Sequence, residues 1–260
     1  MTTTRQRPTN AAAEDRELRT ARQCLYRFCA ISLLDPRMGS WEILRDLANG
    51  PLLQEAAAFI RAQPACAAAE LGPAERPLAD LDPSRVFARL PDAAEKLNKE
   101  YEQTFGLLVS NACPPYETEY IDAKLSFQRS QTLADVSGFF SAFGLKPSSR
   151  LPERHDHIVL ELEFMAFLLD AWKRADDEQN QEQSNVCADA ASRFMEDHLS
   201  RWAPIFAKLL EREQRDDFYH GLGAFLGAFM TAERSLLGLE PLKKLSKPTA
   251  LERPEECEGC

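Results

Sequence analysis

Apolar residues recur every three or four positions along most of this chain, and that spacing places them on one face of an α-helix. The clearest stripe of this kind consists of Ile158, Leu162, Met165, Leu169 and Trp172. Runs that alternate apolar and polar residues, which would predict β-strands, are not evident. The pattern therefore predicts an all-α protein, a helical bundle of roughly 9–11 helices built as one body or as two lobes joined by a hinge loop.

Breaks in the pattern set the expected limits of the helices and of the domain. Asp35 and Pro36 end the first helix, because the residue before a proline disfavours helical geometry, and Ser40 is a suitable N-cap for the next helix. An Ala-, Pro- and Gly-rich stretch at 63–83 predicts a loop or a weakly ordered connection, and a poor place for a functional site. The helices are expected at residues 14–34, 40–62, 84–105, 116–127, 133–143, 155–172, 186–199, 204–211 and 216–237. The predicted organisation is a disordered N-terminus at 1–13, a single all-helical domain at 14–240 with a hinge near 145–155, and a flexible tail at 241–260.

Three glycines, Gly221, Gly223 and Gly227, lie inside the last helical pattern, with no strand before them. A phosphate-binding loop needs a strand, a glycine-rich turn and then a helix, so this arrangement does not predict nucleotide binding. The glycines indicate instead that two helices pack closely at this place.

The charge of the chain restricts the class of partner. Its formal charge of −10, from 31 Lys and Arg and 41 Asp and Glu, argues against a general nucleic-acid binder, which needs a basic face, and favours a partner that carries basic residues. Residues 1–10 lack the apolar run of a secretory signal, and no stretch approaches the ~20 apolar residues of a membrane span. The expectation is a cytoplasmic protein without direct membrane insertion. Its seven cysteines are odd in number and scattered, which predicts reduced thiols.

Two places offer residues that could bind a metal. His155, Asp156 and His157 lie where a proline-containing loop meets the clearest helix, and two histidines two positions apart can ligate a metal from a loop. Asp156 at a helix start is also an ordinary cap, and a further ligand at a recognisable spacing is missing. Cys257 and Cys260 have the spacing of half a zinc or redox site, and a flexible pair of tail thiols is the simpler interpretation.

Catalytic chemistry finds little support in the sequence. His157 and Glu161 lie four positions apart beside the apolar stripe, so they could share a hydrogen bond, either as a fixed surface pair or as part of a binding edge. No nucleophile, oxyanion donor or second carboxylate motif accompanies them. The prediction is a protein that is not an enzyme and has no cofactor.

The segment 113–120 concentrates aromatic and acidic side chains at the start of an expected helix. Tyr116 and Tyr120 offer contact area with little loss of entropy, and Glu117 and Glu119 offer acceptors for the guanidinium group of a partner's arginine. This composition suits peptide recognition. Simple packing of the two tyrosines beside a solvated acidic turn is an equally good interpretation.

Residues 101–106 read Tyr-Glu-Gln-Thr-Phe-Gly, residues 114–120 read Pro-Pro-Tyr-Glu-Thr-Glu-Tyr, and residues 156–165 read Asp-His-Ile-Val-Leu-Glu-Leu-Glu-Phe-Met. Together these segments resemble the TorD, DmsD and NarJ family of redox-enzyme maturation chaperones, which share a proline-proline-tyrosine-glutamate segment and an aspartate-histidine loop before a helix. His155 stands where that family usually has proline, and Thr118 where it usually has serine.

The resemblance implies an all-helical cytoplasmic chaperone. Such proteins bind the twin-arginine signal peptide or the N-terminal region of a molybdenum-containing oxidoreductase subunit and hold it until cofactor insertion and assembly are complete. The expected partner is the catalytic subunit of such a molybdoenzyme, and the expected state of the chaperone is a monomer or a weak dimer. Carried over residue by residue, the resemblance places the following at or near the peptide-binding groove: Tyr116, Glu117, Tyr120, Asp156, His157 and Glu161.

A second hypothesis stays open at this stage. The chain could be a metal- or thiol-carrying maturation factor that uses His155, His157 and the pair Cys257 and Cys260.

Overall fold

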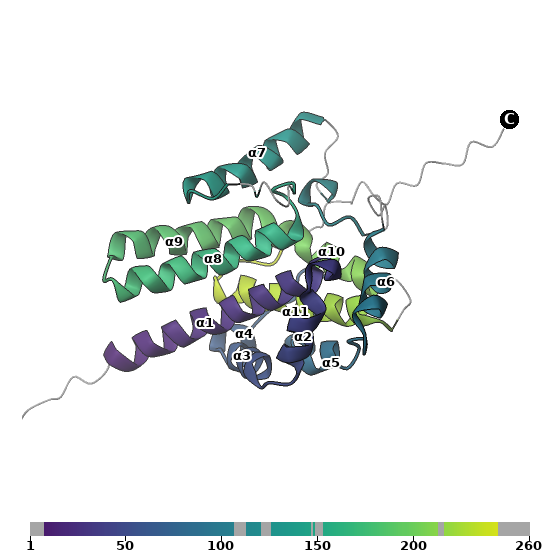
Figure 1. Cartoon of the computed structure of the whole chain (residues 1–260). Coiled ribbons are helices and arrows are strands. Elements are labelled where there is room, and N and C mark those ends of the chain that lie inside the picture. The colour runs from purple at the N-terminus through teal and green to yellow at the C-terminus, as the bar shows by residue number, and fades with distance from the viewer. Residues whose placement is uncertain are drawn as a thin grey trace, which may run out of the picture.

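The computed structural model describes residues 8–106, 113–120, 126–146, 148, 153–212 and 216–243 of the 260-residue chain. Figure 1 shows these residues arranged as packed helices, and no β-strand occurs among them. The prediction of an all-α fold is therefore confirmed. The helices are α1 (Pro8–Leu33), α2 (Ser40–Ala48), α3 (Leu52–Arg61), α4 (Pro64–Ala67), α5 (Pro83–Phe87), α6 (Ala94–Phe105), α7 (Ser126–Ala142), α8 (Ile158–Asp177), α9 (Gln181–Phe194), α10 (Ser200–Arg212) and α11 (Phe218–Leu236). Shorter turns are η1 (Pro36–Met38), η2 (Leu78–Asp80), η3 (Glu117–Glu119) and the π-turn η4 (Met195–Leu199).

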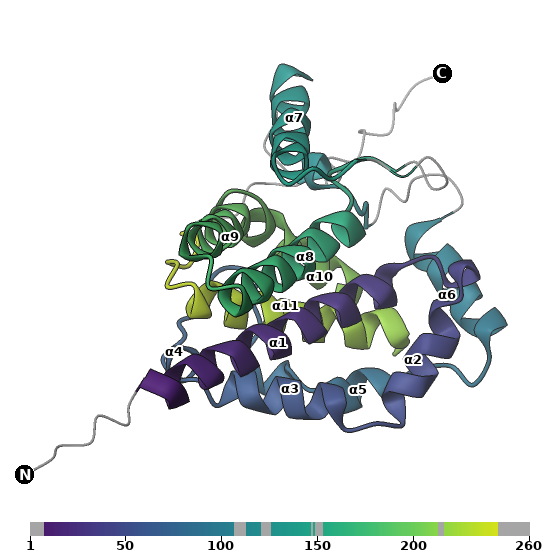
Figure 2. The same cartoon turned by 60° about the vertical axis from the view of Figure 1, so that its left-hand side comes forward.

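The core lies between α1, α8, α10 and α11. Figure 2 shows α1 running beside α8, with α3 and α5 on its other side and α11 behind. The predicted stripe on α8 faces this core, because Leu162, Met165 and Leu169 are fully buried. Trp172, at the end of the stripe, is half-buried, and the guanidinium group of Arg19 covers its ring at 4.7 Å from the centroid. The apolar stripe is thus confirmed as core.

Close packing of α10 against α11 accounts for Gly223 of the last helix. A Cβ atom added at Gly223 would lie 2.6 Å from the backbone oxygen of Ala207, which is closer than van der Waals contact allows. At Gly227 the added atom would lie 2.8 Å from Cγ of Arg76. Gly223 therefore requires glycine for the close approach of two helices, as the sequence predicts, whereas Gly227 faces the flexible side chain of Arg76 in the 63–83 connection.

Several helix limits differ from the prediction. The first helix begins at Pro8 instead of Glu14, so residues 8–13, expected to be disordered, are helical. The helix expected at 40–62 is broken into α2 and α3 around Pro51, and the one expected at 84–105 is broken into α5 and α6 around Pro91. Periodicity did not reveal these breaks, because buried positions such as Leu44 and Leu53 continue on both sides of them.

The connection at 63–83 contains the short turns α4 and η2 and is otherwise largely a loop, as one of the two predictions had it, but it is packed onto the fold, so the prediction of weak order was wrong. Cys66 is buried, and the side chains of Glu75 and Arg234 form an ion pair at 2.6 Å while being only 5% and 4% exposed. The hydroxyl of Thr231 donates to the backbone oxygen of Arg76 at 2.9 Å. The connection is held to α11 partly by these polar contacts, which a search for apolar periodicity does not detect.

The region before α8 also differs from the prediction. Residues 117–119 form a single 3₁₀ turn, η3, and the helix expected at 133–143 begins earlier, at Ser126, as α7. Ala123, which was expected on the first of these helices, lies outside the described residues. In both views α7 lies at the edge of the molecule, next to α8 and α9 and away from α2 and α3 (Figures 1 and 2).

Near the C-terminus the helical path is longer than expected. The segments expected at 186–199 and 204–211 are joined through η4, and Pro204 lies inside α10 without ending it. Asp217 is the N-cap of α11, where its side chain accepts a hydrogen bond from the backbone N–H of His220 at 2.9 Å. Among the residues that the structure describes, no helix combines the length and the apolar character that a membrane span requires.

Candidate functional site

Two of the three sequence segments that carry the family resemblance, 114–120 and 156–165, pair with each other at the start of α8. Tyr116 and His157 form an antiparallel bridge. The backbone N–H of Ile158 donates to the oxygen of Pro115 at 2.9 Å, and that of Glu117 donates to the oxygen of Asp156 at 2.9 Å. Two segments that lie about 40 positions apart in the sequence thus form one unit. We call its first part, residues 113–120, the recognition segment.

Asp156 holds the recognition segment from one side. Its buried carboxylate accepts hydrogen bonds from the backbone N–H of Thr118 at 3.2 Å and from the hydroxyl of Thr118 at 2.8 Å. The guanidinium group of Arg154 pairs with the same carboxylate at 2.7 Å. The sequence suggested Asp156 as an ordinary cap of α8, but the carboxylate of Asp156 does not cap this helix. His157 caps the helix instead, because its Nδ1 accepts from the N–H of Val159 at 3.2 Å.

Glu117 is held from the other side of the recognition segment by a residue that sequence reasoning missed. Both of its carboxylate oxygens lie 3.1 Å from Nδ1 of His198, which belongs to η4. Burial raises the pKa of Glu117, and the contact with His198 partly opposes that rise. The second ring nitrogen of His198, Nε2, faces Asp135 of α7 at 3.6 Å.

Glu161 completes this buried group. Its Oε2 accepts a hydrogen bond from the indole N–H of Trp202 at 3.0 Å. Burial, and then the nearby carboxyl of Glu117, raise the pKa of Glu161 well above its usual range, so this carboxyl favours its neutral form. The hydrogen bond predicted between His157 and Glu161 is absent from these described residues, because each side chain has a different partner.

Tyr120 serves the packing that the sequence offered as the alternative to recognition. It is 1% exposed, its hydroxyl donates to the oxygen of Pro114 at 2.8 Å, and its ring lies 5.2 Å from that of Trp202. Burial raises its pKa well above the usual range for tyrosine. Of the six candidate residues, Tyr120, Glu117, Asp156 and Glu161 are buried inside the protein.

Tyr116 and His157 are the two candidates that reach the surface. Their rings meet edge to face at 5.2 Å, and both side chains are half-buried. The guanidinium group of Arg154 lies 4.4 Å above the Tyr116 ring, and the Tyr116 hydroxyl donates to Glu153 at 3.1 Å. Burial and Glu153 raise the pKa of Tyr116 to about 12, while burial lowers the pKa of His157. We call Tyr116 and His157 the rim. At neutral pH the rim therefore presents a neutral aromatic pair flanked by charged groups.

An apolar cavity of about 320 Å³ lies beside this rim, between α7 and α8. Half of its lining residues are aromatic or aliphatic, and the polar ones include Lys146, Glu163 and Glu153, which binds the Tyr116 hydroxyl. His155 lines the cavity as well, with its Nδ1 at 2.6 Å from the hydroxyl of Ser137. The apolar lining residues are Phe140, Leu145, Leu160, Phe164 and Phe167.

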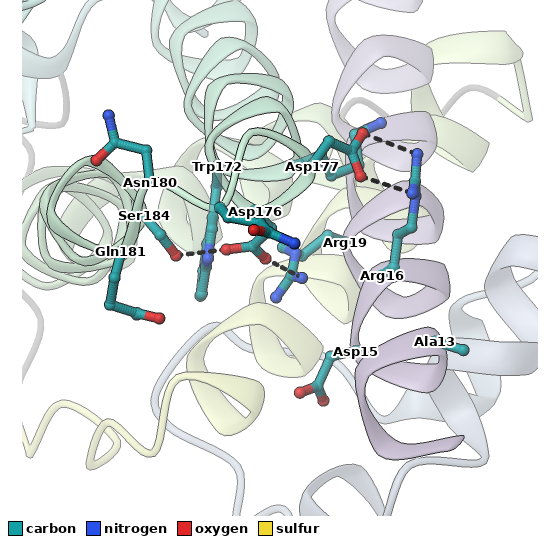
Figure 3. A pocket seen from close by; sticks show the side chains of 12 residues that line it. Ala13, Asp15, Arg16, Arg19, Trp172, Asp176, Asp177, Asn180, Gln181 and Ser184 are labelled. Carbon is teal, nitrogen blue, oxygen red and sulfur yellow. Dashed lines mark hydrogen bonds and ion pairs between the residues drawn. The ribbon is translucent and has the colours of Figure 1, made fainter. Parts of the chain in front are cut away.

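A larger hollow of about 700 Å³ lies at the other end of α8, next to the starts of α1 and α9 (Figure 3). Arg16 pairs with Asp177 at 2.7 Å, and Arg19 pairs with Asp176 at 2.5 Å. These ion pairs connect the ends of α1 and α8 to each other. None of the six candidate residues lines this hollow.

The residues that the structure describes contain no group of three or more histidine, cysteine, aspartate or glutamate side chains placed to hold a metal ion. His155 and His157 direct their Nδ1 atoms to different partners, Ser137 and the N–H of Val159. Cys257 and Cys260 lie outside the described residues. The hypothesis of a metal- or thiol-carrying factor therefore remains a prediction that rests on the sequence alone.

His198 and Trp202 are the functional neighbours that sequence reasoning missed. They lie four positions apart where η4 passes into α10, and they reach Glu117 and Glu161 from 81 and 41 positions away along the chain. In the sequence, a histidine and a tryptophan one helical turn apart are only a weak indication of a functional site, because such a pair is also common at the edge of a core.

Residues 66–208, more than half of the chain, match the protein family described as nitrate reductase delta subunit. The chain is 25% identical over 149 residues to the chaperone protein TorD of Aliivibrio salmonicida, covering 57% of this chain and 67% of the relative. It is 34% identical over 111 residues to the selenate reductase assembly chaperone protein of Thauera selenatis (42% and 55%). It is 32% identical over 116 residues to the chlorate reductase assembly chaperone protein of Ideonella dechloratans (44% and 58%), so the matches span little more than half of these last two relatives. No solved structure matches this chain.

Proposed function

Because this chain belongs to the nitrate reductase delta subunit family, we propose that it is an assembly chaperone for the catalytic subunit of a molybdenum-containing oxidoreductase. It binds the signal peptide or N-terminal segment of that subunit in the cytoplasm and holds it until cofactor insertion and assembly are complete. The role is reversible binding without catalysis, in keeping with the relatives whose names describe chaperones for selenate and chlorate reductases.

The observation that carries the proposal is the pairing of the recognition segment with the start of α8. Asp156 joins the two segments through Thr118, while Glu117, Glu161 and Tyr120 make buried polar contacts around the pairing. Tyr116 and His157 emerge from it at the surface. A rim that is fixed before binding loses little conformational entropy when a peptide docks. We therefore assign the buried carboxylates to positioning, and Tyr116 and His157 to contact with the client.

The surroundings of the rim suit both parts of an export signal. The apolar cavity between α7 and α8 offers a volume of about 320 Å³ to apolar side chains of the client. Glu153 and the exposed Glu163 line the same cavity and can accept hydrogen bonds from arginine. The net charge of −10 favours the approach of a cationic segment.

A direct test is to purify the tagged full-length chain from its native cells and to identify the polypeptides that remain bound. The expected result is one oxidoreductase catalytic subunit at near-equal stoichiometry. Removal of the N-terminal segment of that subunit should abolish its retention. Retention that survives this removal, or recovery of the chain with no such subunit, contradicts the proposal.

Substitutions at the rim test the assigned residues. Tyr116→Ala and His157→Ala should each weaken the binding of the captured N-terminal segment about tenfold, the range of a moderate interface residue. The matched control is His220→Ala on α11, a half-buried histidine whose Nδ1 contacts the backbone oxygen of Glu211. If both rim variants bind the segment as tightly as the control does, the binding groove lies elsewhere. Far-UV circular dichroism checks that the helix content of each variant is unchanged.

A further inference from the structure

His198 occupies a place in the fold that the proposed function does not yet use. Its side chain is 2% exposed and lies against the rings of Phe139, at 5.5 Å, and Phe194, at 4.9 Å. This packing fixes the direction of its two ring nitrogens. Nδ1 lies 3.1 Å from the oxygens of Glu117, and Nε2 lies 3.6 Å from Asp135.

The two contacts of His198 reach two different parts of the candidate site. Glu117 belongs to the recognition segment, directly after Tyr116 at the rim. Asp135 belongs to α7, and α7 also contributes Phe140 to the wall of the apolar cavity. A single imidazole therefore lies between the segment that presents the rim and the helix that forms the cavity.

The two contacts differ in strength. The contact with Glu117 is buried, since both side chains are only 2% exposed, and a hydrogen bond to a charged group at such a place is strong. The side chain of Asp135 is 64% exposed, and its distance of 3.6 Å exceeds that of a normal hydrogen bond, so solvent weakens this second contact. The recognition segment should thus depend on His198 more than α7 does.

We propose that His198 is a positioning residue that holds the recognition segment in place through Glu117 and connects it to α7 through Asp135. Its removal moves Tyr116 from the position in which the rim contacts the client. This inference rests on the proposed function for its consequence in client binding, but not for its consequence in the free protein.

Two substitutions separate the two contacts. In His198→Asn the amide nitrogen lies near the position of Nδ1, so it can still donate to Glu117 but cannot reach Asp135. In His198→Gln the amide nitrogen lies near the position of Nε2, so the contact with Asp135 is kept and the contact with Glu117 is lost. His220→Asn on α11 is the matched control.

Hydrogen exchange of the free full-length chain, followed by mass spectrometry, tests the positioning without any ligand. In His198→Gln, residues 113–120 should exchange about tenfold faster, as expected for the loss of one buried hydrogen bond to a charged group, while α7 stays unchanged. In His198→Asn, α7 should exchange about two- to threefold faster and residues 113–120 should stay unchanged. The proposal is overturned if both variants exchange at the wild-type rate in residues 113–120 and in α7. It is also overturned if exchange rises evenly through the core. Should either variant fail to fold, Asp135→Asn perturbs the exposed contact alone and should reproduce the change in α7.

The consequence for recognition is measured with a labelled synthetic peptide that has two arginines followed by about 12 alternating leucines and alanines, a length within the apolar region of an export signal. His198→Gln should bind it about tenfold more weakly, while His198→Asn should stay within about threefold of the wild type. Equal loss in the two variants, or no loss in a folded His198→Gln protein, contradicts the positioning role. If the wild type itself does not bind the peptide, the proposed function fails, and the exchange measurement still decides the role of His198.

Discussion

Replacement of Glu161 offers a sharp test of the buried polar group. This residue is 0% exposed, its Oε2 accepts the indole N–H of Trp202 at 3.0 Å, and burial together with Glu117 raises its pKa well above the usual range. Its carboxyl therefore resembles an amide more than a carboxylate, since the neutral acid has one oxygen that accepts and one group that donates. Glu161→Gln keeps this shape and this pattern of hydrogen bonding, whereas Glu161→Ala removes both.

The expected magnitudes follow from these contacts. Glu161→Ala leaves the buried N–H of Trp202 without an acceptor, which costs about 1–3 kcal/mol, and removes one buried methylene group, which costs about 0.8 kcal/mol. The sum is a loss of about 2–4 kcal/mol in the free energy of unfolding. Glu161→Gln should lose less than about 1 kcal/mol at mildly acidic pH, because it replaces a neutral group by a neutral group of similar volume.

The dependence on pH has a definite sign. A glutamate whose pKa is raised in the folded state binds its proton more tightly when folded, so its contribution to stability is complete at low pH and is lost as pH rises toward the raised folded pKa. The loss is at most about 1.4 kcal/mol for each pH unit above the ordinary pKa of glutamate. Glutamine does not titrate, so Glu161→Gln should become more stable relative to the wild type as pH increases.

Urea unfolding followed by far-UV circular dichroism, at several pH values between about 5 and about 8, measures both effects. Asp92→Asn provides a control for the charge change, because this exposed carboxylate pairs with Lys96 at 2.6 Å and has its pKa lowered by that pair. Two results would refute the reasoning. One is a loss in Glu161→Gln as large as that in Glu161→Ala, and the other is a difference between wild type and Glu161→Gln that does not change with pH.

Two further substitutions test the packing and the ion pairs of the core, each by urea unfolding. Gly223→Ala should lower the free energy of unfolding by about 1–3 kcal/mol, because its Cβ would lie 2.6 Å from the backbone oxygen of Ala207. The control Gly138→Ala has open space around the added atom and should be neutral or slightly stabilising. Equal effects of the two substitutions would contradict the close approach of α10 and α11. Glu233→Gln should cost about 3–5 kcal/mol, because it leaves the buried guanidinium group of Arg22, now 2.8 Å from the carboxylate, without a counter-charge; a loss below about 1 kcal/mol would show that this charge is compensated elsewhere.

The sequence predicted the fold class and the core of α8 because both depend on apolar periodicity. Leu162 and Met165 follow the helical period and are fully buried. The breaks near Pro51 and Pro91 were missed because the apolar faces of the flanking helices continue across them. The connection at 63–83 was misjudged for a different reason, since the ion pair of Glu75 with Arg234 helps to hold it and its buried apolar residues, such as Cys66 and Leu81, are few and widely spaced.

The candidate site shows a similar division. A motif identifies which residues act together, and here it correctly brought the segments around Tyr116 and His157 into one place. It could not predict which side chains face solvent, because burial depends on partners distant in the sequence. Glu117 and Glu161 are polar and would be expected at the surface, yet His198 and Trp202 enclose them.

This enclosure gives a physical reason for polar residues at these positions. Replacing Glu117 and Glu161 by apolar residues of similar volume would not necessarily destabilise the core, because buried charged groups are costly to desolvate. Apolar residues, however, pack in many similar ways, whereas the hydrogen bonds from His198 to Glu117 and from Trp202 to Glu161 fix one geometry. A chaperone that recognises a short peptide through a few rim side chains depends on the position of that rim. Under the proposed function, the buried carboxyls serve recognition through the place they give to Tyr116, although they never reach the surface themselves.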